Sequence, residues 1–426
     1  MFSLASIEFW GGLGVIGSSK ILVREGGHRV LLDVGLDIPG EANLFRAPVG
    51  ERPGRELADW LRVGGAPHLP GLYDPAALPA DHPLAAPFDG DTAVFISHPH
   101  IDHVGLAGFV RPEIPVHAHT EAVDVLTALT ASGAGLPGGD PVWHRLAAGQ
   151  TVRVGEIEVE CVPVDHDVPG ACGYLVRTPD GSLAYTGDLR FHGRHADRSW
   201  SFVERAAGVD ALVIEGTTLS FAQPDGPFRT EDDVRTSFVD SLRESTGLVL
   251  LSLYPRDIER VTDFLTAAAE SGRTVVWPAK TAKFLRDFGV AGISTWGAGA
   301  DLADVQAKPG EYVVVPDVSA LPDLLDLPLR PGDVFVHANG EPLGEFDPRW
   351  AVFVDWLDHL GVQLRKIGCW GHASPEDLHT MVERVAPKAV FPIHTFEPTR
   401  LYPPSTVRRV VPQYGQFYNL AGHPIP

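Results

Sequence analysis

Short apolar runs that alternate with polar residues dominate the first part of the chain. The runs IEFW, KILVRE and RVLLDVG within residues 6–36 are short and bounded by polar residues or glycine, and they predict strands that open a sheet. DTAVFIS is continuously apolar and predicts a buried strand directly before HPHIDHVG. From residue 151 onward, TVRVGEIEVECVPV, GYLVRT and SLAYTGD predict further strands. This part of the chain is therefore expected to be rich in sheet.

The stretch from about residue 218 to 360 has a different pattern, in which strands alternate with helices. LVLLSLY precedes a helical RDIERVTDFLTAAAE, and TVVWPA and YVVVPD precede a helical SALPDLLD and the strand DVFVHA. Such alternation predicts a parallel sheet with covered faces. VQLRKIG, a helix in SPEDLHTMVERVA and a strand in AVFPIH then return to the first pattern. We expect one domain from residues 1–217 and 363–426, interrupted by an α/β domain at 218–362.

A proline- and glycine-rich stretch joins two predicted strands between about residues 37 and 90, with one short helix at RELADWLRV. Connections of this length are often functional lids or insertions. We expect residues 40–90 to form a partly ordered cover near the mouth of the functional site. A plain surface excursion is the alternative.

Composition and charge limit the class of protein. With 426 residues, 44% of them hydrophobic, the chain is expected to be a soluble protein of two or three domains. The net charge of −21 argues against binding duplex nucleic acid over the whole surface, although a local basic groove stays open. Three widely spaced cysteines favour a reducing compartment. No membrane span or secretory signal is recognisable, so we expect a cytoplasmic protein.

The strongest chemical signal is the segment His98-Pro99-His100-Ile101-Asp102-His103. It follows a predicted strand and offers four potential metal ligands within six residues. Two histidines two positions apart can point at one ion, and the following Asp-His pair can bind a second ion nearby. Imidazole and carboxylate groups suit zinc and related metals. The alternative, a polar turn with chance histidines, is far less specific.

Three more residues lie where predicted strands end: His166 in VPVDHDVPG, Asp188 in AYTGDLR and His394 in AVFPIH. Each alone would more often be a surface or core residue. Together they complete a set for two metals. His98, His100 and His166 would hold one ion, Asp102, His103 and His394 the other, with Asp188 bridging. We expect two divalent ions, zinc first and manganese as the alternative.

The order and the residues of these motifs resemble those of the metallo-β-lactamase superfamily and, within it, of the β-CASP nucleases of the ribonuclease J type. FWGGLGVIGSSKILVREGGHRVLLDVGLDIPG resembles the family's first two strands, and GHASPEDLHTMVERVAPKAVFPIH resembles its closing segment. The resemblance implies a four-layer αβ/βα sandwich with an inserted α/β β-CASP domain. It also implies hydrolysis of single-stranded nucleic acid, RNA above all. We expect no counterpart of the additional C-terminal domain of ribonuclease J, which leaves the oligomeric state open.

The resemblance also assigns catalytic residues. Glu215 in LVIEGTT matches the acidic residue that opens the inserted domain, and His372 in CWGHAS matches the general acid. Asp102 and Asp188 belong to the same machinery, with a hydroxide that bridges the metals as nucleophile. Phosphodiester hydrolysis also needs a proton for the leaving oxygen, which a histidine backed by a carboxylate can supply. A loop acid and a helix cap are the alternatives for Glu215 and His372.

Five residues are candidates for binding the substrate. Gly371 and Ser374 begin a predicted helix, and helix N-terminal amides attract phosphate. In ribonuclease J-like enzymes the matching segment helps to hold a 5′-terminal phosphate. Asn339 and Gly340 in HANGEP resemble a family loop that faces it, and Arg190 lies in the basic segment RFHGRHADR. A helix cap, a plain turn and a solvated loop are the respective alternatives.

Departures from the family pattern affect the surroundings of the metal ligands. Trp370 replaces a serine, Thr395-Phe396 replace Gly-Glu, and Ser18-Ser19 stand where an acidic residue and Asn are usual nearby. The sequence therefore supports the type of reaction better than it supports the identity of the substrate. A hydrolase of a small molecule and a non-catalytic relative are the rival functions. The second H-x-H, His117 and His119, is not followed by Asp-His and predicts a structural or surface role.

Overall fold

The computed structural model describes residues 5–36, 49–222, 228–345 and 347–426. Unit 1 comprises Met1–Thr130, Gly135–Asp225 and Gly371–Pro426, and unit 2 comprises Ala131–Ala134 and Gly226–Trp370. Unit 2 therefore interrupts the sequence of unit 1. The domain limits expected from the sequence at 217 and 362 stay a prediction. In the described ranges no helix is long and apolar enough to cross a membrane.

The first sheet of unit 1 has the strand order β22-β21-β1-β2-β3-β4-β5-β6. β2 and β3 form an antiparallel hairpin around Gly26-Gly27, whose positive φ angles suit a tight turn. β3, β4, β5 and β6 pair in parallel, because helical crossovers connect them. The strands are β1 (Ser6–Phe9), β2 (Ile21–Glu25), β3 (His28–Leu32), β4 (Thr92–Ile96), β5 (Val116–His119), β6 (Trp143–Leu146), β21 (Phe417–Tyr418) and β22 (Pro424–Ile425).

The second sheet of unit 1 has the order β20-β19-β11-β10-β9-β8-β7. β7 to β10 form an antiparallel meander, whereas β10, β11 and β19 are parallel neighbours. Three strands therefore end at the same edge of this sheet. The strands are β7 (Thr151–Val154), β8 (Ile157–Pro163), β9 (Cys172–Thr178), β10 (Gly181–Tyr185), β11 (Ala211–Glu215), β19 (Ala389–Ile393) and β20 (Arg408–Arg409).

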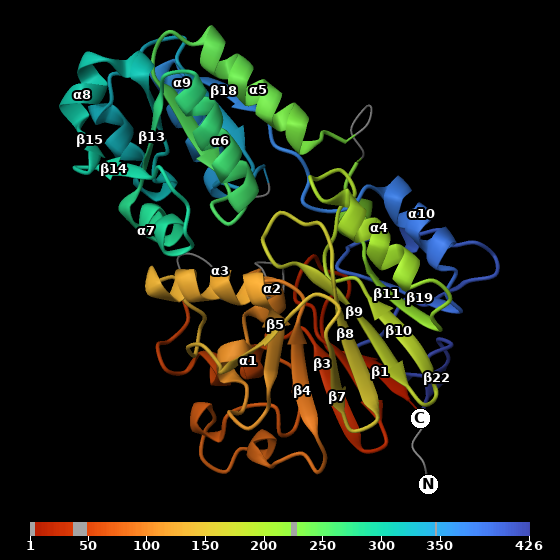
Figure 1. Cartoon of the computed structure of the whole chain (residues 1–426). Helices are drawn as coiled ribbons and strands as arrows, with labels where there is room; N and C mark the ends of the chain where they lie inside the picture. Colours follow the sequence, from red (N-terminus) through yellow and green to blue (C-terminus); the bar gives the residue numbers. More distant parts are fainter. Residues whose placement is uncertain (1–4, 37–48, 223–227, 346) are drawn as a thin grey trace. The chain divides into compact units, whose positions relative to one another are not determined.

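The two sheets of unit 1 pack face to face, with helices on both outer faces (Figure 1). Phe9 of the first sheet packs on Phe391 of the second, with ring centroids 5.2 Å apart. The first sheet is covered by α1 (Glu56–Val63), α2 (Ile101–Val104) and α3 (Thr120–Ala131), and the second by α4 (Ala196–Arg205) and α10 (Pro375–Val385). Unit 1 is thus the expected four-layer αβ/βα sandwich.

Unit 2 contains one parallel sheet in the order β15-β14-β13-β16-β12-β17-β18 (Figure 1). Its strands are β12 (Val249–Leu253), β13 (Thr274–Trp277), β14 (Ser294–Trp296), β15 (Gly299–Ala300), β16 (Tyr312–Val314), β17 (Val334–Ala338) and β18 (Gln363–Lys366). Its helices are α5 (Glu231–Glu244), α6 (Ile258–Glu270), α7 (Ala279–Asp287), α8 (Leu302–Ala307) and α9 (Arg349–Leu360). The alternation of strands and helices in the sequence is confirmed here.

Two segments of unit 2 differ from the sequence prediction. VQLRKIG is grouped with the first sequence pattern, yet β18 pairs in parallel with β17 and is an edge strand of this sheet. SALPDLLD is not an α-helix but part of the 3-10 segment η6 (Val318–Asp326). Pro322 lies inside it and Ala320 has non-helical φ and ψ angles. Proline removes one helical hydrogen bond and clashes with the preceding turn, which accounts for the difference.

The described residues of the proline-rich segment before β4 do not form the partly ordered cover that we expected. Residues 49–90 contribute Leu57, Trp60 and Tyr73 to the core on the outer face of the first sheet. Backbone bonds fix the segment further, including Arg111 N to the Leu72 carbonyl. Its apolar residues are spaced irregularly because they form short 3-10 turns, at Pro75–Ala77 and Pro83–Ala85. Residues 37–48, on which part of the prediction falls, lie outside the described residues.

Candidate metal centre

The predicted ligand residues gather within unit 1, where several strands of both sheets end. His98 and His100 follow β4, His166 follows β8, and Asp188 follows β10. His394 follows β19 directly and has a φ of 56°, a left-handed conformation that is rare for residues other than glycine. Strained backbone of this kind is maintained where the surrounding structure requires it. The fold therefore brings together the residues that the sequence motifs singled out.

The first cluster consists of His98, His100 and His166. The Nδ1 atom of His100 lies 3.1 Å from Nε2 of His98 and 3.3 Å from Nε2 of His166. Metal–nitrogen bonds of about 2.0–2.1 Å at tetrahedral angles place two nitrogen ligands about 3.3 Å apart. Burial lowers the pKa of His166 to about 3, so this ring is neutral and can bind a cation. The three nitrogens are spaced to hold one ion.

The second cluster consists of Asp102, His103, Asp188 and His394, all of them buried. Nε2 of His394 lies 3.1 Å from Oδ2 of Asp102 and 3.4 Å from Nε2 of His103. Oδ2 of Asp188 lies 3.2 Å from Nε2 of His103 and 3.5 Å from Nε2 of His394. These are again the distances expected between ligands of one ion, and the mixed oxygen and nitrogen set suits zinc or manganese.

Asp188 connects the two clusters. Its Oδ2 atom, which belongs to the second cluster, lies only 3.7 Å from Nε2 of His98 in the first. Its Oδ1 atom is buried and accepts no hydrogen bond from any residue that the structure describes. A buried carboxylate oxygen without a partner is costly unless a cation neutralises it. The residues present therefore fit two divalent cations with Asp188 between them.

Asp33 is a functional residue that the sequence reasoning missed. Its carboxylate, at the end of β3, accepts four hydrogen bonds and is inaccessible to solvent. The donors are Nδ1 of His103 (2.7 Å), the Ser97 amide (2.6 Å) and hydroxyl (2.7 Å), and the Tyr185 hydroxyl (2.5 Å). The bond to Nδ1 of His103 turns Nε2 toward the second cluster. The available signal was an aspartate directly after a buried strand, in RVLLDVG.

In three other candidate ligands, too, the ring nitrogen that faces away from the cluster contacts a neighbouring oxygen. The carbonyl of Gly371 lies 2.6 Å from Nδ1 of His166. The hydroxyl of Thr217 lies 2.7 Å from Nδ1 of His394, and that of Ser97 lies 3.0 Å from Nδ1 of His98. Each contact fixes a ring so that its other nitrogen faces its cluster, as is usual for metal-binding histidines.

The predicted proton donor and its carboxylate partner lie beside the second cluster. Nδ1 of His372 lies 3.6 Å from Oε2 of Glu215 and 3.9 Å from Oδ2 of Asp188. Backbone amides of Ala373 and Thr217 fix the Glu215 carboxylate, at 3.2 and 2.8 Å. Burial lowers the pKa of His372, but the surrounding carboxylates, Glu215 first and then Asp188 and Asp167, together raise the pKa to about 9. Glu215, His372 and His394 are also close enough to share an ion, which is the rival role for His372.

The predicted substrate-binding residues have varied surroundings. Ser374 caps α10, since its hydroxyl accepts the amide hydrogen of Asp377 at 3.1 Å. Arg190 is 1% exposed and pairs with the buried Asp165 at 3.1 Å, which argues against the predicted phosphate contact. In unit 2, Asn339 has a φ of 63° and its side chain donates to the Cys369 carbonyl. Next to it, Gly340 packs against Ser252 so tightly that a side chain would collide with it.

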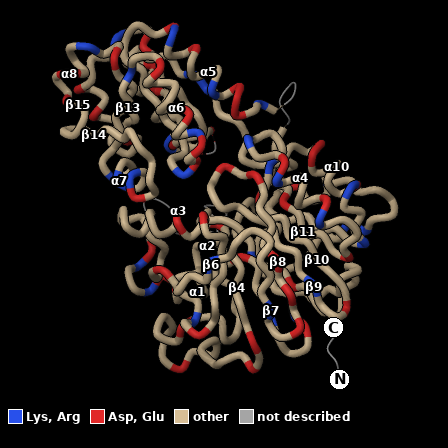
Figure 2. The backbone as a smooth tube through the Cα atoms, in the orientation of Figure 1, with Lys and Arg blue, Asp and Glu red and all other residues tan. Residues whose placement is uncertain are grey.

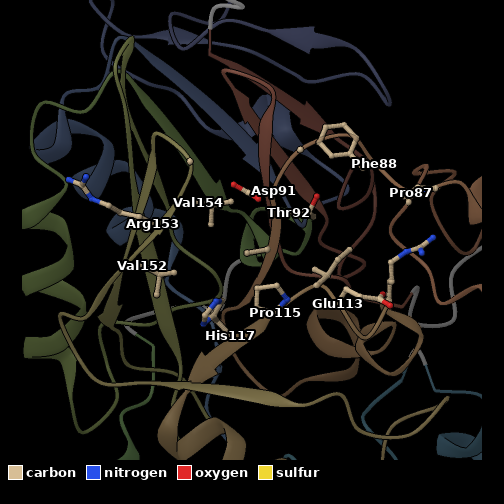
Figure 3. A pocket seen from close by; sticks show the side chains of 16 residues that line it. Pro87, Phe88, Asp91, Thr92, Glu113, Pro115, His117, Val152, Arg153 and Val154 are labelled. Atoms are coloured by element: carbon tan, nitrogen blue, oxygen red, sulfur yellow. The ribbon is translucent and has the colours of Figure 1, made fainter.

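His117 lies away from the two clusters, as its departure from the motif indicates. It is 8% exposed, stacks on Phe95 with ring centroids 4.8 Å apart, and burial lowers its pKa to about 4. It lines a pocket of about 620 Å³ near the N-terminal ends of β4 and β5 (Figure 3). Phe88, Glu113 and Val152 line the same pocket, which includes none of the predicted site residues.

Comparisons with known proteins agree with this architecture. A family model for the beta-lactamase superfamily domain matches residues 68–239. Ribonuclease J of Mycobacterium tuberculosis is 24% identical over 416 residues, which cover 90% of this chain and 67% of that protein. Ribonuclease J of Sinorhizobium meliloti is 27% identical over 280 residues, which cover 62% of this chain and 43% of that protein.

One solved structure extends the likeness to nearly the whole chain. It is the crystal structure of a protein of unknown function from Enterococcus faecalis V583, with a TM-score of 0.82 and 27% identity. The match covers 97% of this chain and 99% of the other. The expected fold class and the resemblance seen in the motifs are thereby confirmed.

Proposed function

We propose that this chain, a member of the metallo-β-lactamase superfamily that resembles ribonuclease J, is a metal-dependent nuclease that cleaves single-stranded RNA. The observation that carries the proposal is the pair of ligand clusters joined by Asp188. Two adjacent metal sites that share a carboxylate are typical of enzymes that hydrolyse phosphodiesters. A cytoplasmic location stays a prediction.

The chain's own residues would hold two divalent ions. His98, His100 and His166 supply the first site, and Asp102, His103 and His394 supply the second, with Asp188 shared. When bound, two such cations supply a hydroxide from water near neutral pH and neutralise charge on the phosphate. Asp33 and the other outer partners keep the ligand atoms aimed inward, so little rearrangement is needed on binding.

His372 is the residue placed to protonate the leaving oxygen. It lies beside the clusters, and its side chain keeps 18% of its surface exposed, so a substrate can reach it. Glu215 holds the ring by charge and is itself held by two backbone amides. A histidine kept protonated near neutral pH and then released can act as a general acid.

Substrate class is the less constrained part of the proposal. The matched relatives are named ribonuclease J, which favours RNA. Against this, the chain carries a net charge of −21, and basic residues are interspersed with acidic ones along both units (Figure 2). A hydrolase of a small phosphodiester or another small molecule is therefore the second candidate.

Activity measured on three kinds of substrate tests the proposal. Purified protein loaded with zinc or manganese is incubated with 5′-labelled single-stranded RNA, the matching DNA, and a simple aryl phosphodiester. We expect RNA to be cleaved and His100→Ala to be inactive. His144→Ala, which changes an exposed histidine on β6, serves as the matched control and should retain activity. Turnover of the simple diester without cleavage of RNA would favour the second candidate.

A second comparison tests the expected anion site at Gly371 and Ser374. Amides at the start of α10 attract phosphate, and Ser374 is already used as the cap. We expect RNA with a 5′-monophosphate to be cleaved faster than RNA with a 5′-hydroxyl. Equal rates for the two RNAs would count against a phosphate pocket there.

A further inference from the structure

Five histidines supply ring nitrogens to the two clusters, and each ring also has a second nitrogen that faces away. For four of these rings the outward nitrogen has a neighbour described above: Ser97, Asp33, Gly371 or Thr217. His100 is the fifth, and it differs because its Nδ1 atom faces the cluster. Its outward atom is therefore Nε2.

The outward atom of His100 faces a carboxylate outside the predicted ligand set. Oδ1 of Asp167 lies 3.5 Å from Nε2 of His100 and 3.3 Å from Nε2 of His166. This oxygen is buried and accepts no hydrogen bond from the residues that the structure describes. Asp167 itself is absent from the cluster of three nitrogens, so it lies next to the first site without being one of its ligands.

The backbone of Gly371 makes room for this carboxylate. A Cβ atom at Gly371 would lie 2.5 Å from Oδ2 of Asp167, closer than real Cβ contacts allow. The same glycine accepts the hydrogen bond from Nδ1 of His166. Gly371 thus supports the first cluster in two ways, through its carbonyl and through its missing side chain.

We propose that Asp167 is a positioning residue for the first metal site. The charge of its carboxylate, 3.5 Å from Nε2 of His100, favours the ring hydrogen on that nitrogen, which leaves Nδ1 free of a proton and aimed at the ion. It also adds negative charge to a cluster of three imidazole rings whose other carboxylate, Asp188, is shared with the second site. A carboxylate behind a metal-binding histidine raises the basicity of the ring and fixes its orientation. This inference rests on the metal centre of the proposed function.

Zinc binding to the purified protein tests the role without using activity. Zinc affinity is measured by competition with a chromophoric chelator for the wild type, Asp167→Ala and Asp167→Asn. We expect Asp167→Ala to lower the affinity for one of the two zinc ions by about 10- to 100-fold and to leave the affinity for the other unchanged. Asp167→Asn keeps an oxygen acceptor but loses the charge, so a smaller loss is expected. Asp89→Ala removes one exposed charge before β4 and should behave as the wild type.

A second background assigns the affected ion to its site. His103→Ala removes a ligand of the second cluster only, so it should bind one ion at the first site. Adding Asp167→Ala to His103→Ala should then lower the affinity for that remaining ion. Circular dichroism shows whether each variant is folded. If Asp167→Ala does not fold, the zinc affinity of Asp167→Asn decides the test.

The outcomes separate this inference from the proposed function. Unchanged zinc affinity at both sites in folded Asp167→Ala and Asp167→Asn would overturn the role of Asp167. Weakening of the second-site ion alone would overturn it as well. A wild-type protein that binds no zinc or manganese would instead overturn the metal centre itself.

Discussion

Replacing Asp33 by asparagine is expected to destabilise unit 1 and to weaken its second metal site. The substitution keeps the size of the side chain, and asparagine tolerates the φ of 62° found at this position. Only the charge and one acceptor are lost. Three of the four donors converge on Oδ2, so the best placement of the amide oxygen is there. The amide nitrogen then faces the Ser97 amide, donor against donor.

The magnitude follows from that mismatch. A hydrogen bond to a charged group contributes about 1.5–3 kcal/mol, and a buried donor left unpaired costs about 1–3 kcal/mol. The free energy of unfolding of metal-free protein should therefore fall by about 2.5–6 kcal/mol. Tyr185→Phe is the matched control, since it removes one donor and leaves the charge with three. It should cost about 1.5 kcal/mol.

Urea unfolding of metal-free protein and zinc titration together check the reasoning. We expect the unfolding midpoint of Asp33→Asn to fall well below that of Tyr185→Phe. We also expect the second ion to bind about 10- to 100-fold more weakly, because His103 loses the group that orients it. An Asp33→Asn protein as stable as the wild type, with both ions bound as tightly, would refute the argument.

Four further outcomes are expected. Asp188→Ala should fold but bind fewer than two ions and lose turnover, because its carboxylate reaches both clusters; metal analysis that still finds two ions would exclude bridging. His372→Ala should keep both ions and lose about 10²- to 10⁴-fold in rate, whereas loss of an ion would make it a ligand. In the wild type, kcat should fall at alkaline pH, once His372 loses the proton that the neighbouring carboxylates favour. Glu215→Gln removes one of the charges that raise the pKa of His372, so the alkaline fall should move to lower pH; an unmoved profile would separate Glu215 from His372.

The metal clusters could be predicted because each ligand follows a strand that is readable from local pattern. His166, Asp188 and His394 lie far apart in sequence, yet each occurs shortly after an apolar run. Strands of a sandwich that end on the same side bring such residues together, so strand order alone was enough. The chemistry of imidazole and carboxylate then limited the choice of ligand to metal.

The groups behind the ligands were not predictable in the same way. Asp33 looks like any polar residue after a strand, and its partners Ser97 and Tyr185 lie on other strands. Arg190 shows the opposite error, because its neighbours in sequence are basic while its partner Asp165 is brought to it by the fold. Whether a charged side chain faces solvent or a buried partner depends on tertiary contacts, which periodicity does not contain.

The prediction for the segment before β4 was wrong for a related reason. Prolines and glycines remove the regular spacing by which buried faces are recognised, so its apolar residues were taken for those of a cover. In the structure Tyr73, outside any helix, is inaccessible to solvent, and its hydroxyl donates to the Pro67 carbonyl at 2.7 Å. Irregular backbone can thus bury apolar side chains without any periodic signature.

The insertion of unit 2 within the sequence of unit 1 has a consequence for synthesis on the ribosome. All three histidines of the first cluster precede Gly226–Trp370, the long segment of unit 2, whereas His372 and His394 follow it. A growing chain therefore contains these three histidines before the long segment of unit 2 is made, but Gly371, the proton donor and the last ligand of the second cluster follow only after that segment. If the protein cleaves RNA as proposed, it stays catalytically incomplete until its messenger has been translated beyond the long segment of unit 2.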